Sequence, residues 1–125
     1  MYKRQILEAT REKIEQNLFL KNKKVIFTSG ATESNNLALL GFARKYYKKT
    51  GIYGHIITLK TEHKAVLEPL KLLKKEGFMV TEIIPEKDGL ISEEQFKKNI
   101  REDTCLVSVM SVSYTHLTLP TKRIV

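Results

Sequence analysis

The sequence predicts an α/β fold in three layers, with a mostly parallel sheet and helices on both faces. Segments with helical periodicity alternate with short runs of β-branched and aromatic residues along the chain. The connections between these segments are short, and no internal repeat or low-complexity linker interrupts them. Alternation of this kind favours parallel strands joined by crossover helices. Sheets of this class bind ligands at the carboxyl ends of their strands.

Three elements are predicted in the first part of the chain. The stretch "ILEATREKIEQNL" predicts an amphipathic helix over 6–18, with one apolar face formed by Ile6, Ala9, Ile14 and Leu18. The run "KVIFTS", 24–29, has the composition of a buried strand. The stretch "ESNNLALLGFARKYYKKTG" predicts a long helix that stops at Thr50 and Gly51.

The second part of the chain continues the alternation. Strands are predicted over "HIITLK", "FMVTEIIP" and "TCLVSVM", which are residues 55–60, 78–85 and 104–110. Helices are predicted over 62–77 and 91–100. Pro69 should kink or break the first of these helices near Glu68, because proline removes a helical hydrogen bond. Ser92 is a candidate N-cap of the second.

The two ends of the chain resemble translated sequencing-adapter DNA. Codons of the adapter used in a common transposase-based library encode "VSYTHLTLPT", 112–121, and the transposon end of such libraries encodes "MYKRQ". We therefore expect 1–5 and 111–125 to be adapter-derived, with the origin of Lys122–Val125 left open, and 6–110 to form one partial domain. The tail from Val112 should then have no packed place in the sheet.

The charge balance is weaker evidence for nucleic-acid binding than it first suggests. The chain carries 22 basic and 14 acidic residues, a net charge of +8, but four of the basic residues lie in the suspect ends, so that +4 remains for 6–110. The remaining lysines cluster late in predicted helices, where solvent and the helix dipole favour cations. We expect no nucleic-acid partner, no metal and no membrane association. A single cysteine among many lysines is consistent with the reducing cytoplasm.

The densest cluster of small polar residues, "FTSGATESNN" at 27–36, follows a predicted strand and opens a predicted helix. A turn of this kind exposes backbone N–H groups at the positive end of a helix, which suits a phosphate. Gly30 would permit the bend, and Ala31 and Thr32 are small enough for close approach, with the Thr32 hydroxyl as a further donor. An ordinary capped helix remains the alternative, since neither a Walker A nor a dinucleotide motif is present.

The motifs together resemble the cysteine desulfurases of the fold-type I, class V aminotransferase group. The resemblance rests on "FTSGATESNNLAL", "HIITLKTEHKAVLEPLKLLKKEGFMVTEIIPEKDGLI" and "DTCLVSVM" in this order, and covers 6–110. The form "SGATES" is closer to the NifS/IscS-like branch than to the SufS-like branch. The resemblance implies part of the large, cofactor-binding domain and pyridoxal 5′-phosphate as cofactor, with its phosphate held by the Ala31 and Thr32 amides and the Thr32 hydroxyl.

The second motif, "TEHKAVL", contributes His63, which by resemblance stacks on the cofactor ring and assists proton transfer. An imidazole just after a strand and at a helix start is well placed for a ligand, although a surface or cap histidine would look the same. His63 should lie at the same edge of the sheet as Thr32. Lys64 is interpreted as a surface lysine rather than the cofactor-linked lysine, and Cys105 as a core residue rather than the nucleophile.

The resemblance implies an enzyme that converts L-cysteine to L-alanine and transfers the sulfur to one of its own cysteines, for iron–sulfur cluster or thio-nucleotide synthesis. It further implies a homodimer, and a sulfur-acceptor or scaffold protein as partner. The family motifs that carry the cofactor-linked lysine and the nucleophilic cysteine are not found in the sequence, so the chain alone should be inactive. The alternatives are another class V enzyme, such as a selenocysteine lyase or an aminotransferase, and a non-enzymatic phosphate- or nucleic-acid-binding module.

Overall fold

The structure, a computed structural model, describes residues 2–111. The chain forms two compact units, Met1–Gly30 and Ala31–Val125, and each is considered by itself. The prediction for the tail from Val112 onward falls outside the described residues. Within residues 2–111, no helix is both long enough and apolar enough to cross a membrane.

The first unit consists of helix α1, Tyr2–Asn17, and an irregular segment that follows it. The helix predicted from Ile6 is therefore present and begins at Tyr2. The chain leaves α1 through Phe19 and Asn22, both of which have positive φ angles, 52° and 59°. Left-handed conformations of this kind reverse the chain direction.

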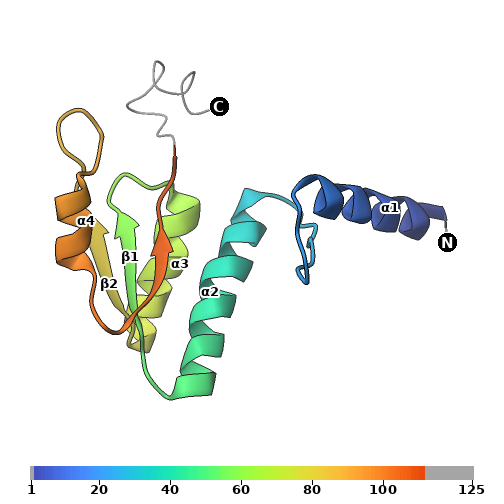
Figure 1. Cartoon of the computed structure of the whole chain (residues 1–125). Coiled ribbons are helices and arrows are strands. Elements are labelled where there is room, and N and C mark those ends of the chain that lie inside the picture. Colours follow the sequence, from blue (N-terminus) through green and yellow to red (C-terminus); the bar gives the residue numbers. More distant parts are fainter. Residues whose placement is uncertain (1, 112–125) are drawn as a thin grey trace. The chain divides into compact units, whose positions relative to one another are not determined.

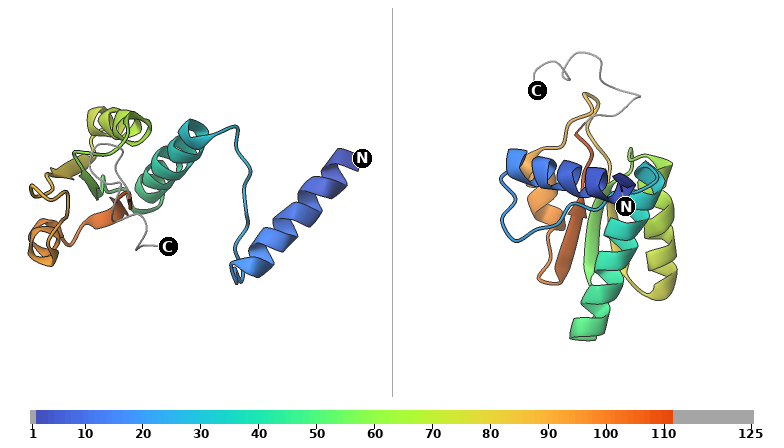
Figure 2. Two further views of the ribbon diagram at one scale, coloured as in Figure 1. Left: turned by 90° about the horizontal axis from the view of Figure 1, so that it is seen from above. Right: turned by 90° about the vertical axis from the view of Figure 1, so that its right-hand side faces the viewer.

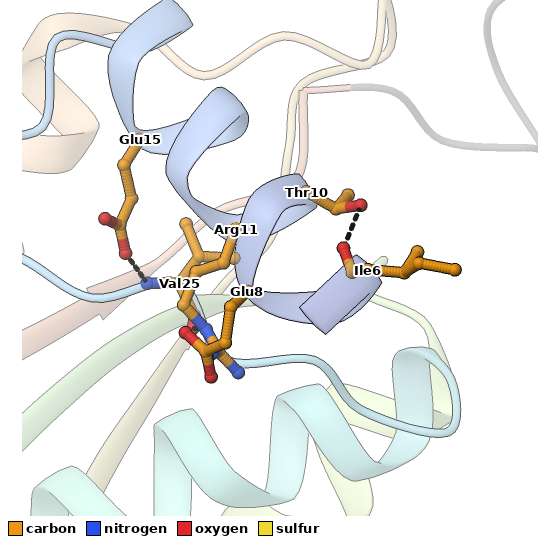
Figure 3. Close-up of polar contacts among 6 residues, drawn as sticks. All are labelled: Ile6, Glu8, Thr10, Arg11, Glu15 and Val25. Atoms are coloured by element: carbon orange, nitrogen blue, oxygen red, sulfur yellow. Dashed lines mark hydrogen bonds and ion pairs between the residues drawn. The ribbon is translucent and has the colours of Figure 1, made fainter. Parts of the chain in front are cut away.

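The strand predicted over 24–29 is wrong, because this segment forms no strand in the structure. Figure 3 shows the side chains of α1 that bond to the backbone of Val25 where a neighbouring strand would otherwise pair with it. Its N–H donates to the Glu15 carboxylate at 3.0 Å, and its carbonyl accepts from Nε of Arg11 at 2.9 Å. Arg11 also lies 5.3 Å from the ring centre of Phe27. Side chains of α1 thus satisfy backbone groups that a neighbouring strand would otherwise satisfy.

The second unit is built on a three-stranded parallel sheet with the strand order β2-β1-β3 (Figure 1). The strands are β1, His55–Leu59, β2, Met79–Ile83, and β3, Thr104–Ser108. All three lie within the predicted ranges. The helices are α2, Ala31–Thr50, α3, Lys64–Glu76, and α4, Glu93–Asn99.

The two faces of the sheet are covered by different helices, as the three-layer prediction requires. Alternate residues of β1 point to opposite faces, so Ile56 packs with Leu39 of α2 and Leu70 of α3, whereas Ile57 packs toward Phe96 of α4. Figure 2, seen from above, shows α3 and α4 on opposite sides of the sheet. The crossovers from β1 to β2 and from β2 to β3 run in opposite directions across the sheet, and right-handed connections then place their helices on opposite faces.

The ends of the helices follow the local sequence, with one exception. Gly51 ends α2 with a φ of 73° and its N–H on the Tyr47 carbonyl, and Ser92 caps α4 through a reciprocal capping box with Gln95. The break predicted near Glu68 is absent, because α3 runs through Pro69. Pro69 is buried against the rest of the unit. Tertiary packing here outweighs the loss of one helical hydrogen bond.

Candidate functional site

The turn predicted to bind a phosphate lies at the amino end of α2. Ser29 and Gly30 form a bend, and the helix begins at Ala31, so the predicted turn and helix start are both present. Gly30 is not among the residues with positive φ, so the bend does not depend on glycine there. The first amides of a helix have no partner within the helix, and the positive end of the α2 dipole lies at these amides.

His63 lies between the end of β1 and the start of α3, where it caps the helix. Its Nδ1 accepts the N–H of Ala65 at 3.1 Å, and its backbone is extended, with φ −65° and ψ 153°. An Nδ1 that accepts a hydrogen bond leaves the proton of the neutral ring on Nε2. Within residues 2–111 Nε2 has no hydrogen-bond partner, and the side chain is exposed. The residue is therefore a cap whose second ring nitrogen is available to a ligand.

Thr32 and His63 line the same groove between α2 and α3. The groove measures about 460 Å³, and α2 contributes Thr32, Asn36 and Leu40 to its wall. The opposite wall comes from His63 and from the first turns of α3. The volume lies within the range of small-molecule sites in proteins. Two of the three predicted site residues thus share one cavity, while Ala31 lies beside it at the first position of α2; their roles stay predictions.

Lys64 and Cys105, for which the sequence predicts no role in the chemistry, occupy different surroundings. Lys64 is exposed in the first turn of α3, as expected of a surface lysine, and it also lines the groove. Cys105 is half-buried near the amino end of β3 and packs against the core cluster of α2 and α3. Burial raises the pKa of its thiol, which disfavours the nucleophilic thiolate. The interpretation of Cys105 as a core residue is confirmed.

Sequence reasoning missed Glu62, the residue before His63. Its side chain is only 7% exposed, and its carboxylate accepts the N–H of Met110, just past β3. Burial raises the pKa of the carboxyl, and the hydrogen bond from Met110 partly opposes this shift. An acidic residue between a strand and a helix usually indicates a solvated turn, so the local pattern held no signal of its burial.

A second buried polar group, at the opposite edge of the sheet, was also missed. His55 is fully buried at the start of β1, and its two ring nitrogens lie 2.7 Å from the hydroxyls of Thr104 and Thr81. It links the first residue of β1 to the first residue of β3 and to the middle of β2. Desolvation, followed by the charge of Arg101, lowers the pKa of the imidazole. This histidine lies away from the groove and acts in the fold.

Comparison with known proteins agrees with the resemblance seen in the motifs. The family model for class V aminotransferases matches residues 1–119. Cysteine desulfurase IscS of Photobacterium profundum is 49% identical over 107 residues, which cover 86% of this chain and 26% of that protein. Among solved structures, a NifS-like protein has a TM-score of 0.73 and 38% identity, over 85% of this chain and 28% of that one.

A further solved structure is a complex with an amino acid. SspA in complex with cysteine is 43% identical, with a TM-score of 0.64, and the match covers 70% of this chain and 24% of that one. The chain thus spans about a quarter of the length of the relatives that it matches.

Proposed function

The chain belongs to the class V aminotransferase family, as its motifs predict, and we propose that it forms part of a cysteine desulfurase. The enzyme converts L-cysteine to L-alanine and transfers the sulfur to one of its own cysteines as a persulfide. The observation that carries this proposal is the 49% identity to a cysteine desulfurase across 86% of the chain. The cysteine complex of the neighbour SspA supports cysteine as the substrate.

Pyridoxal 5′-phosphate is the cofactor that the described residues fit. The amides of Ala31 and Thr32 and the Thr32 hydroxyl would hold its phosphate at the positive end of α2. Thr32 suits this role because its side chain is exposed on the groove and has no hydrogen-bond partner within residues 2–111. When bound, the cofactor supplies an electron sink for the bonds of the substrate amino acid.

His63 would stack on the cofactor ring and move a proton at Nε2. The hydrogen bond from the Ala65 amide to Nδ1 fixes the plane of the imidazole and its tautomer. With Nδ1 occupied as an acceptor, the ring carries its proton on Nε2, and Nε2 is the atom through which this ring can donate a proton. The helix start therefore orients the ring before any ligand binds.

The cofactor-linked lysine and the nucleophilic cysteine are assigned to the remainder of the enzyme, since the chain spans about a quarter of the length of its relatives. Cys105 is half-buried with a raised pKa, and Lys64 is an exposed lysine of α3, so neither is proposed as nucleophile or cofactor-linked lysine. The chain by itself would then be inactive. We further propose a cytoplasmic homodimer that passes sulfur to an acceptor or scaffold protein, for iron–sulfur clusters or thio-nucleotides.

The proposal is tested with the full-length protein that contains this segment. Incubation with L-cysteine should yield alanine and sulfide in equal amounts once a reductant is present. Turnover restricted to selenocysteine would identify a selenocysteine lyase, and amino transfer to a keto acid without sulfide release would identify an aminotransferase. Either result would replace the desulfurase assignment.

A further inference from the structure

Glu62 joins the turn that carries His63 to the end of the neighbouring strand. Its carboxylate accepts the N–H of Met110 at 2.5 Å, across 48 positions of sequence. Met110 lies two residues beyond the end of β3. The contact therefore lies at the carboxyl edge of the sheet, where ligands of parallel sheets bind.

The carboxylate replaces a backbone partner that β1 no longer provides. The register of β1 with β3 runs as far as Thr58 and Ser108, where the Thr58 hydroxyl also donates to the Ser108 carbonyl at 3.0 Å. β1 then leaves the sheet through a turn in which the N–H of Glu62 donates to the Leu59 carbonyl at 3.2 Å. The Glu62 side chain reaches back and accepts the N–H of Met110, a backbone donor just beyond β3.

The side chains of Glu62 and His63 lie on opposite sides of the turn. The backbone at His63 is extended, and neighbouring side chains of an extended chain point to opposite sides. Glu62 is buried toward β3, and His63 is exposed on the groove. The imidazole is thus fixed from two directions, by the Glu62 anchor behind it and by the Ala65 amide at Nδ1.

We propose that Glu62 is a positioning residue of the site, which holds the His63 turn in place through its bond to the Met110 amide. This inference rests on the proposed function in one respect, that His63 contacts the cofactor. Glu62 does not touch the groove itself, since it is not among the residues that line it.

The free-energy cost of burying the Glu62 carboxylate supports a role for it beyond packing. A buried carboxylate is expensive unless it is paired, and within residues 2–111 no lysine, arginine or histidine forms an ion pair with Glu62. The raised pKa of the carboxyl reflects this burial. Unfavourable burial of a titratable group next to a candidate site is typical of functional positions.

The test compares Glu62→Leu and Glu62→Gln with Thr58→Val in the full-length protein. Thr58→Val removes another side-chain bond between β1 and β3, five positions before His63, and is the matched control. Glu62→Gln keeps an oxygen that can accept the Met110 N–H. Hydrogen exchange is measured in the cofactor-free protein at the Met110 amide and at the imidazole C2 position of His63, followed by kcat, KM and cofactor affinity of the loaded enzyme.

Glu62→Leu should speed exchange at Met110 by about tenfold or more, because a hydrogen bond to a charged group is lost. It should also change the exchange rate at His63 and lower kcat by about tenfold, while cofactor affinity stays within about threefold because the phosphate contacts remain. Glu62→Gln should keep the exchange rates of the parent at both positions. Thr58→Val should leave His63 unchanged.

Two results would overturn the proposal. One is wild-type exchange at His63 in Glu62→Leu, and the other is an equal change at His63 in Thr58→Val. If Glu62→Leu does not fold, Glu62→Gln decides: altered exchange at His63 with Met110 still protected would show that the bond is not what positions the ring. The exchange measurements need no turnover, so they remain informative if the protein proves not to be a desulfurase.

Discussion

Replacing Thr32 by alanine separates the stability of the fold from the binding of the cofactor phosphate. The Thr32 side chain is exposed, lines the groove and forms no hydrogen bond within residues 2–111. Its removal should therefore change the free energy of unfolding by no more than about 0.5 kcal/mol. Alanine is also the better helix former, which offsets part of any loss.

The same substitution should weaken cofactor binding substantially. A hydroxyl that donates to a phosphate forms a charge-assisted hydrogen bond, whose loss costs about 1–3 kcal/mol. That energy corresponds to a rise of about 5- to 150-fold in the dissociation constant of pyridoxal 5′-phosphate. The measurement is a titration of the cofactor-free, full-length protein followed by its absorbance.

Thr32→Ser is the control, because serine keeps the hydroxyl and removes only the methyl group. It should bind the cofactor within about threefold of the parent, since the charge-assisted bond is retained. If Thr32→Ala bound pyridoxal 5′-phosphate as tightly as the parent, the assignment of Thr32 to the phosphate would be refuted. An equal loss in both variants would assign the effect to shape rather than to the hydroxyl.

Three further substitutions or treatments test separate parts of the structure. His63→Ala should lose both the helix cap, about 1 kcal/mol, and desulfuration, whereas His63→Asn should recover the stability but not kcat; full activity in His63→Asn would exclude a role for the imidazole. Burial lowers the pKa of His55 below its usual 6.5, so the unfolded chain binds the proton first and stability should fall as the pH drops below about 6.5. Denaturant unfolding between pH 8 and 5 should show this slope, and His55→Gln should remove it; an unchanged slope would assign it to other groups. The 125-residue chain mixed with pyridoxal 5′-phosphate and borohydride should yield no stable adduct at Lys64 by mass spectrometry, and a stoichiometric one would reverse the interpretation of that lysine.

The sheet unit could be predicted from sequence because its signals are local. The β-branched runs at β1, β2 and β3 and the caps at Ser92 and Gly51 act within a few residues of themselves. The strand predicted over 24–29 failed because strand formation needs a partner, and the side chains of α1 satisfy Val25 instead. A local propensity cannot show which distant groups will compete for a backbone.

Among the site residues, the same distinction between local and distant signals decides what could be found. Thr32 and His63 stand in short motifs at helix starts, so their positions could be read directly. Glu62 lies next to His63, but the hydrogen-bond partner of its carboxylate is the amide of Met110, which is 48 positions away. His55 is likewise defined by Thr81 and Thr104 on two other strands. Polar residues whose partners come from other strands need the fold before they can be interpreted.

The structure also shows why a cap and a ligand-binding residue need not be alternatives at His63. An imidazole has two nitrogens, and capping α3 occupies only Nδ1, through the Ala65 amide. This bond sets the tautomer and orients the ring, which a functional group must otherwise obtain from a dedicated second residue. Asparagine or serine would cap the helix as well but would leave no second nitrogen on the groove. A histidine at this N-cap therefore combines a stable helix start with an oriented Nε2 on the groove that Thr32 also lines. The need for a helix cap does not by itself explain why the residue is a histidine.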